Sequence, residues 1–188
     1  MSNKRVIYIL LTHSGSILSK CIKTYTREPY SHVSIALDHT LNELYSFGRI
    51  KPNNPLIGGF VKEDIIRGTY SRFPNTTCAL YSLEISDLQY NRLRKEIYKF
   101  KSEKEKYGYN LIGLIGVMLD VPMEKEYNYF CSQFVATLLY NSGVYLFRKS
   151  AGLVSPKDFR QCGNLELMYE GKLMDYWKEE KLYYSSIV

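Results

Sequence analysis

The sequence predicts an α+β domain in which one central antiparallel sheet is packed by helices. Three observations predict this class. Segment 32–37 alternates large apolar residues with small or polar ones, which is the two-residue period of a half-buried strand. Segments 87–100 and 129–140 place apolar residues at helical spacing, with cap or stop signals at their ends. The length of 188 residues suits one domain with a full core, so we expect a single domain over residues 1–188.

The first part of the chain predicts three strands and a long connection. Residues 5–12 are rich in Val, Ile, Tyr and Leu, which indicates a buried strand. The alternating strand 32–37 turns at 38–40, and residues 41–47 return as its antiparallel partner. Residues 48–68 carry two prolines and a Gly-Gly pair, so we expect a long irregular loop there. Connections of this length often serve as lids or binding loops.

The second part of the chain predicts a further strand and two strong helices. Residues 77–84 favour a strand, and either Ser86 or Asp87 can cap the helix that follows it. The helix over 129–140 ends just before Gly143, which is a typical stop signal. The apolar stripe of the first helix consists of Tyr90, Leu93, Ile97 and Phe100.

Four shorter predictions complete the expected fold. Residues 14–22 begin with small polar residues and continue at helical spacing, which favours a helix. The apolar, glycine-punctuated segment 109–119 predicts a short buried helix or a packed loop. Ser155-Pro156 has the cap and first-turn residues of another short helix. The tail alternates around Glu170-Gly171, so we expect a C-terminal hairpin appendage over 163–188.

The charge of the chain is compatible with an anionic partner. The formal net charge is +6, which could attract lipid headgroups, cell-wall polymer or nucleic acid. The densest basic run is 92–106, but three glutamates dilute it and no helix-turn-helix, zinc-finger or RNP signature accompanies it. We therefore interpret this run as a solvated helix face and do not expect a nucleic-acid partner. An anionic membrane surface stays open as a partner.

The cysteines and apolar runs bear on compartment and cofactors. Four cysteines are widely spaced, with no C-x-x-C pair and no histidine at metal-ligand spacing, so neither a metal site nor a disulfide framework is expected. We expect no cofactor. The apolar run 6–11 is too short for a secretion signal, and 111–119 is too short to cross a bilayer. We therefore expect a soluble, cytoplasmic protein.

Two residues stand out as candidates for chemistry. Cys131 begins the helix over 129–140, where unpaired backbone N–H groups and the helix dipole favour thiolate over thiol. A buried cysteine that acts only as a small hydrophobe is the alternative. His32 stands at the start of the alternating strand, where a functional group can project into a cleft, although a structural histidine is the alternative. His13, directly after the first strand, is its rival.

A Cys–His pair needs a third group that orients the imidazole and stabilises its cation. If the hairpin turns near His39, Glu43 lies on the same face as His32, and we predict it as this third group. A slip of one residue in the register would put Leu44 and Ser46 there instead.

The two candidate segments together resemble a known family. Tyr-Ser-His-Val-Ser-Ile-Ala-Leu at 30–37 is followed, about a hundred residues later, by Tyr-Phe-Cys-Ser-Gln-Phe-Val at 129–135. This order is similar to that of the permuted NlpC-type papain-like enzymes, which include YiiX-like proteins and the lecithin:retinol acyltransferase-like enzymes. The segment Leu-Val-Ser-Pro-Lys-Asp at 153–158 also resembles a step that follows the nucleophile helix in YiiX-like members. The resemblance covers residues 5–159, and the segments 48–68 and after Gln161 depart from it.

The resemblance implies a permuted papain-like fold and a cysteine hydrolase. It implies Cys131 as the nucleophile, His32 as the general base and Glu43 as the third member. An amidase or peptidase acting on a peptide or a cell-wall fragment is the first expectation. The alternatives are a lipid acyltransferase or thioesterase and a non-catalytic module that binds a membrane or a protein. The residues expected to bind substrate are Tyr30, Tyr45, Tyr129 and Ser132.

Overall fold

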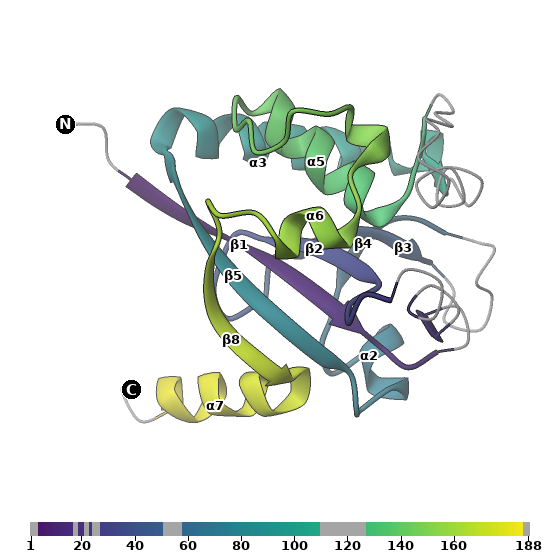
Figure 1. Cartoon of the computed structure of the whole chain (residues 1–188), viewed down its shortest axis with the longest axis vertical. Coiled ribbons are helices and arrows are strands. Elements are labelled where there is room, and N and C mark those ends of the chain that lie inside the picture. Colours follow the sequence, from purple (N-terminus) through teal and green to yellow (C-terminus); the bar gives the residue numbers. More distant parts are fainter. Residues whose placement is uncertain are drawn as a thin grey trace.

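A six-stranded antiparallel sheet forms the centre of the molecule (Figure 1). The computed structural model describes residues 4–16, 19–20, 23, 27–50, 58–109 and 127–185. The order of the strands in the sheet is β4-β3-β2-β1-β5-β8. Their bounds are β1 (Lys4–His13), β2 (His32–Ala36), β3 (Leu44–Arg49), β4 (Gly58–Glu63), β5 (Thr77–Ser86) and β8 (Glu166–Lys172). Two short parallel strands, β6 (Gly108–Tyr109) and β7 (Asn128–Tyr129), pair separately.

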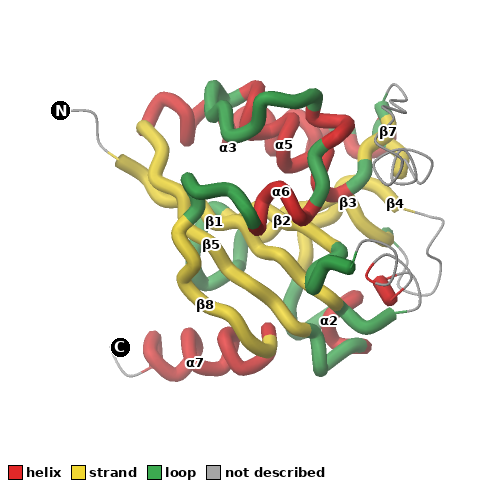
Figure 2. The backbone as a smooth tube through the Cα atoms, in the orientation of Figure 1, coloured by secondary structure: helices red, strands yellow, loops and turns green. Residues whose placement is uncertain are grey.

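Helices cover both faces of the sheet (Figures 1 and 2). One face carries α3 (Asp87–Ser102), α5 (Cys131–Asn141) and α6 (Pro156–Arg160). The other carries α2 (Gly68–Arg72) and α7 (Leu173–Ser185). The 3-10 helix η1 (Lys104–Lys106) follows α3, and the 3-10 helix η2 (Ala151–Leu153) precedes α6. The α+β class with one antiparallel sheet is confirmed.

The alternation of side chains along each strand divides the core into two clusters. On β1, Ile9 and Leu11 pack toward α3 and α5, whereas Leu10 packs toward α2 and α7. On β2, Val33 and Ile35 belong to the first cluster. His32 and its alternate neighbours on β2 therefore lie on the face that α2 and α7 cover.

Local sequence signals explain the long helices. Ser86 accepts a hydrogen bond from the Gln89 backbone, and Gln89 returns one to the Ser86 backbone, so a capping box starts α3. Leu93, Ile97 and Phe100 are buried along its predicted stripe. The same kind of box starts α6 at Ser155. These elements agree with the predictions from spacing and caps.

Two predictions about the connections are wrong. Residues 58–63, expected inside a loop over 48–68, form β4 and pair with all of β3 from Leu44–Glu63 to Arg49–Gly58. The tail is not a hairpin, because Gly171 lies inside the continuous strand β8 and helix α7 follows it. β8 instead pairs with β5 at the edge of the sheet. The predictions for 14–22 and 109–119, and the rest of the 48–68 loop, lie wholly or largely outside the described residues.

Within the described part of the chain, no helix is long and apolar enough to cross a membrane.

Candidate active site

Cys131 occupies the first turn of α5, at a helix end that has no side-chain cap. Phe130 is the N-cap residue, and its side chain accepts no hydrogen bond from the helix. The first backbone N–H groups of α5 are therefore free of a side-chain cap. The backbone N–H groups of Val33 and Ser132 donate to the Cys131 sulfur. Cys131 is buried, with 3 % of its surface exposed. The sulfur is thus held among donors that favour its anionic form.

His32 reaches this sulfur because the sheet opens beside it. Among the described residues, the ladder between β2 and β3 joins Ile35 to Tyr45 and Ala36 to Leu44 and does not extend to His32. Helix α5 contacts both β2 and β3. The imidazole of His32 and the thiol of Cys131 form a hydrogen bond there. The two predicted residues are therefore brought together.

The other imidazole nitrogen binds a carboxylate that sequence reasoning missed. His32 Nε2 lies 2.7 Å from Glu63 Oε1, which leaves Nδ1 as the nitrogen that faces sulfur. Ser46 Oγ donates to the same Glu63 oxygen. The Glu63 side chain is 9 % exposed, whereas the His32 side chain keeps 24 % of its surface exposed. The sulfur of Cys131, the imidazole of His32 and the carboxylate of Glu63 thus form a continuous series of contacts, and His32 is its partly exposed member.

The charges in this chain stabilise one another. Burial lowers the pKa of His32, but the negative charges of Glu63 and Cys131 outweigh burial and raise it to about 10. Burial raises the pKa of Cys131, but the charge and hydrogen bond of His32 outweigh burial and lower it below the ordinary thiol value. Burial likewise raises the pKa of Glu63, and the His32 cation outweighs it and holds the carboxyl ionised. The three groups therefore favour one another's charged forms: thiolate on Cys131, imidazolium on His32 and carboxylate on Glu63.

The other described cysteines lack this environment. Burial, followed by the negative charge of Glu170, raises the pKa of Cys78 to about 12. Cys162 is half-buried and, like Cys78, is a free thiol. Of the three cysteines that the structure describes, Cys131 is the one whose surroundings favour the thiolate.

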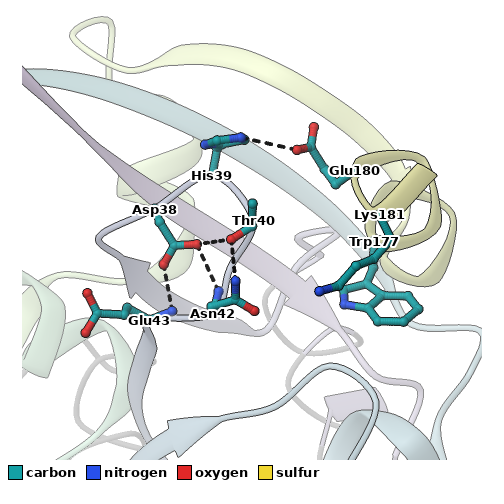
Figure 3. A pocket seen from close by; sticks show the side chains of 8 residues that line it. All are labelled: Asp38, His39, Thr40, Asn42, Glu43, Trp177, Glu180 and Lys181. Carbon is teal, nitrogen blue, oxygen red and sulfur yellow. Dashed lines mark hydrogen bonds and ion pairs between the residues drawn. The ribbon is translucent and has the colours of Figure 1, made fainter. Parts of the chain in front are cut away.

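Glu43, predicted as the third group, does not face His32. It lies in the β2–β3 turn, where its backbone N–H donates to Asp38 Oδ2 at 2.7 Å (Figure 3). The register pairs Ala36 with Leu44, so the face of His32 continues into Leu44 and Ser46. The observed register is thus the alternative one, shifted by one residue, in which Leu44 and Ser46 share the face of His32. Glu43 itself accepts a hydrogen bond from the Tyr45 hydroxyl.

Two of the predicted substrate-binding tyrosines are structural. Tyr30 is 5 % exposed, and its hydroxyl donates to Glu170 Oε1 on β8 at 2.6 Å. Tyr45 is 4 % exposed and stacks on Phe60, with ring centroids 5.8 Å apart. Both rings belong to the core cluster on the α5 side of the sheet, and their hydroxyls bind Glu170 and Glu43.

Ser132 is also structural, whereas Tyr129 lies beside the site. The Ser132 side chain is fully buried and donates to the Val154 carbonyl at 2.7 Å. Tyr129 is half-buried on β7, two positions before Cys131. It lines a groove of about 480 Å³ between α5 and residues 144–154. Of the four predicted substrate contacts, Tyr129 alone adjoins both the nucleophile and a groove.

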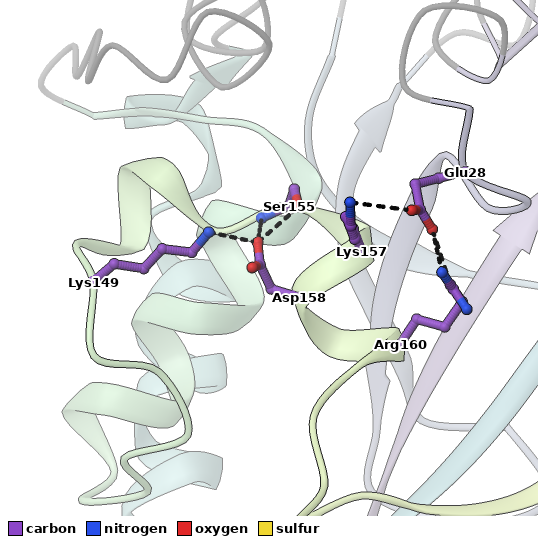
Figure 4. A network of polar contacts seen from close by, with 6 residues as sticks. All are labelled: Glu28, Lys149, Ser155, Lys157, Asp158 and Arg160. Atoms are coloured by element: carbon purple, nitrogen blue, oxygen red, sulfur yellow. Dashed lines mark hydrogen bonds and ion pairs between the residues drawn. The ribbon is translucent and has the colours of Figure 1, made fainter.

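Ion pairs fix the segment that leads into β2 (Figure 4). Arg160 on α6 binds Glu28 Oε2 through Nε at 2.9 Å and Nη2 at 2.8 Å. Lys157 Nζ lies 3.7 Å from the other Glu28 oxygen. This clamp tethers the chain four positions before His32. A neighbouring network on α6 joins Lys149, Ser155 and Asp158.

Within the described ranges, no cluster of three or more His, Cys, Asp or Glu side chains could hold a metal ion. A scan against models of protein families finds no match to this chain, and a search of curated proteins finds no significant match.

Proposed function

We propose that this protein is a cysteine hydrolase that cleaves amide bonds through a thioester acyl-enzyme. Cys131 would be the nucleophile, His32 the general base and acid, and Glu63 the group that orients His32. The observation that carries the proposal is the chain of contacts from a thiol at a helix start, through an imidazole, to a buried carboxylate 2.7 Å from that imidazole.

In the first half-reaction the Cys131 thiolate attacks the substrate carbonyl carbon. A carbon–sulfur bond forms, and the carbonyl π electrons move to oxygen. When the tetrahedral intermediate collapses, the carbon–nitrogen bond breaks and the His32 imidazolium gives its proton to the leaving amine. A thioester on Cys131 and a neutral His32 are the products of this step.

In the second half-reaction His32 takes a proton from water, which attacks the thioester carbonyl. The carbon–sulfur bond breaks, and the carboxylic acid product leaves a thiolate beside an imidazolium. If an amine or alcohol replaces water, the same steps make the site an acyltransferase. Glu63 keeps its charge throughout and stabilises the imidazolium in both halves.

The uncapped start of α5 supports the oxyanion in both steps. Backbone N–H groups at a helix start are preorganised donors, and one such donor commonly contributes about 3 kcal/mol to a transition state. Phe130 supplies no side-chain cap that would compete for them.

The fold that we propose for this chemistry is a permuted papain-like one. A histidine on a sheet strand comes first in the chain, and a cysteine at a helix start comes later. One antiparallel sheet with α3, α5 and α6 on one face supports this assignment. Peptides or cell-wall fragments are the substrate class that we propose.

The experiment is acylation by p-nitrophenyl acetate, a small activated ester that requires no substrate recognition. We expect a burst of p-nitrophenolate and an acetyl group on Cys131, located by mass spectrometry of peptides. The His32→Ala variant should lose the burst, and Cys162→Ser should keep it. Acetylation spread over the other cysteines, or a burst that survives His32→Ala, would overturn the proposal.

A further inference from the structure

We propose that Tyr70 is a positioning residue for the active site, whose hydroxyl donates to Glu63 Oε2 and thereby sustains the thiolate of Cys131. The inference rests on the proposed function, because it concerns the same Cys131–His32–Glu63 chain. Tyr70 lies on α2, outside the segments from which the site was predicted.

The surroundings of Glu63 on the α2 side of the sheet are polar and buried. We call them the polar cluster, and its members other than Glu63 are 0 to 6 % exposed. The five members come from five separate elements, β1, β2, β3, β4 and α2. The members of the polar cluster are Thr12, Ser34, Ser46, Glu63 and Tyr70.

One oxygen of Glu63 in this cluster still needs a donor. Oε1 receives hydrogen bonds from His32 and Ser46. Oε2 is buried and has no donor at ordinary hydrogen-bond distance. An ionised carboxylate with a buried, unpartnered oxygen is costly, and native proteins supply such atoms with a partner. Besides His32 and Ser46, Tyr70 is the cluster member whose side chain interacts with Glu63.

Tyr70 is placed to supply that donor. Its hydroxyl lies 3.5 Å from Thr12 Oγ1 and interacts with Glu63 and Ser34. Burial first, and then the charge and hydrogen bond of Glu63, raise the pKa of Tyr70 well above its ordinary value, as donation to a carboxylate does. Either hydroxyl can donate in the contact between Thr12 and Tyr70. When the single phenol proton is donated to Glu63, Thr12 is the donor to the phenol oxygen.

The Tyr70–Glu63 hydrogen bond affects Cys131 through two ion pairs, Glu63–His32 and His32–Cys131. The titratable groups that face Glu63 are His32 from β2 and Tyr70 from α2, and those that face His32 are Glu63 and Cys131. If Glu63 loses a donor, its negative charge is less stable and its support of the His32 imidazolium weakens. The thiolate of Cys131 then forms at higher pH.

The test is the pH profile of Cys131 alkylation by iodoacetamide in the Tyr70→Phe variant. We expect the midpoint to rise by about one pH unit, so that the rate below the midpoint falls by about tenfold. The matched control is Tyr176→Phe. Tyr176 is equally buried in the same core cluster, and its hydroxyl donates to the His39 carbonyl at 2.7 Å, away from Glu63. The control should keep the midpoint of the unmodified protein.

The Thr12→Val variant is a second test that leaves Tyr70 unchanged. It decides the role of Tyr70 if the Tyr70→Phe variant does not fold. Because Val cannot donate to the phenol oxygen, we expect a rise of the midpoint that is smaller than that in Tyr70→Phe. An unchanged midpoint in the folded variant, or an equal rise in Tyr176→Phe, would overturn the role of Tyr70. A midpoint in the unmodified protein as high as that of an ordinary thiol would overturn the proposed function itself.

Discussion

The Glu63→Gln substitution tests whether the third member of the site is Glu63, which lies beside His32 in the structure, or Glu43, which the sequence predicts. At 2.7 Å between His32 Nε2 and Glu63 Oε1, the gross attraction of the charges is about 6 kcal/mol at an effective dielectric constant of about 20. Desolvation of the buried carboxylate offsets much of this. A hydrogen bond to a charged group contributes about 1.5 to 3 kcal/mol net, which corresponds to about 10- to 150-fold in rate.

The assay is the second-order rate constant for acetylation of Cys131 by p-nitrophenyl acetate at neutral pH. We expect Glu63→Gln to fall near the lower end of that range, because the amide oxygen can still accept from His32. The matched control is Glu43→Gln, which changes the net charge equally at an exposed turn residue. An unchanged rate in Glu63→Gln, or an equal loss in Glu43→Gln, would refute the assignment of Glu63.

Two further substitutions test residues assigned to structure rather than chemistry. Ser132→Ala removes the buried hydrogen bond to the Val154 carbonyl; we expect the free energy of unfolding in urea to fall by about 1 to 2 kcal/mol and the acetylation rate to stay within about twofold. A large loss of rate without a loss of stability would return Ser132 to the substrate site. Arg160→Met removes the two short contacts of Arg160 with buried Glu28 and leaves the longer ion pair to Lys157; we expect the free energy of unfolding to fall by about 1 to 3 kcal/mol, and unchanged unfolding would contradict the clamp.

The helices and the paired central strands could be predicted because their signals are local. The capping box at Ser86 and the stripe through Phe100 lie within one helix. The alternation in β2 likewise fixed which face His32 occupies. Cys131 stood out because it begins a strong helix, a position that spacing within one segment reveals.

The third member of the site could not be predicted, because it depends on pairing between distant segments. Glu63 reaches His32 only when β4 pairs with β3, and the connection between these strands carries loop-like prolines and glycines. Its one available signal was the short run Phe60-Val61-Lys62-Glu63, which is too brief to distinguish a strand from a loop. The choice of Glu43 failed for a related reason, since one residue in the turn at Asp38 reverses the face of β3.

The tail shows how a local turn signal can mislead. Glu170-Gly171 has the composition of a hairpin turn, yet both residues lie in β8. Pairing with β5 and the Tyr30–Glu170 hydrogen bond hold this segment extended. Tertiary pairing here overrides the preference of the dipeptide.

The account depends most on the charge state of Cys131. Thiolate absorbs in the ultraviolet where thiol does not, so the difference in absorbance between the unmodified protein and Cys131→Ser can be followed as pH is lowered. The lowered pKa of Cys131 beside a His32 whose pKa is about 10 predicts that the thiolate signal persists below the pH at which an ordinary thiolate is protonated. A signal that appears only as pH rises through the range of an ordinary thiol, about 8.5, would contradict it.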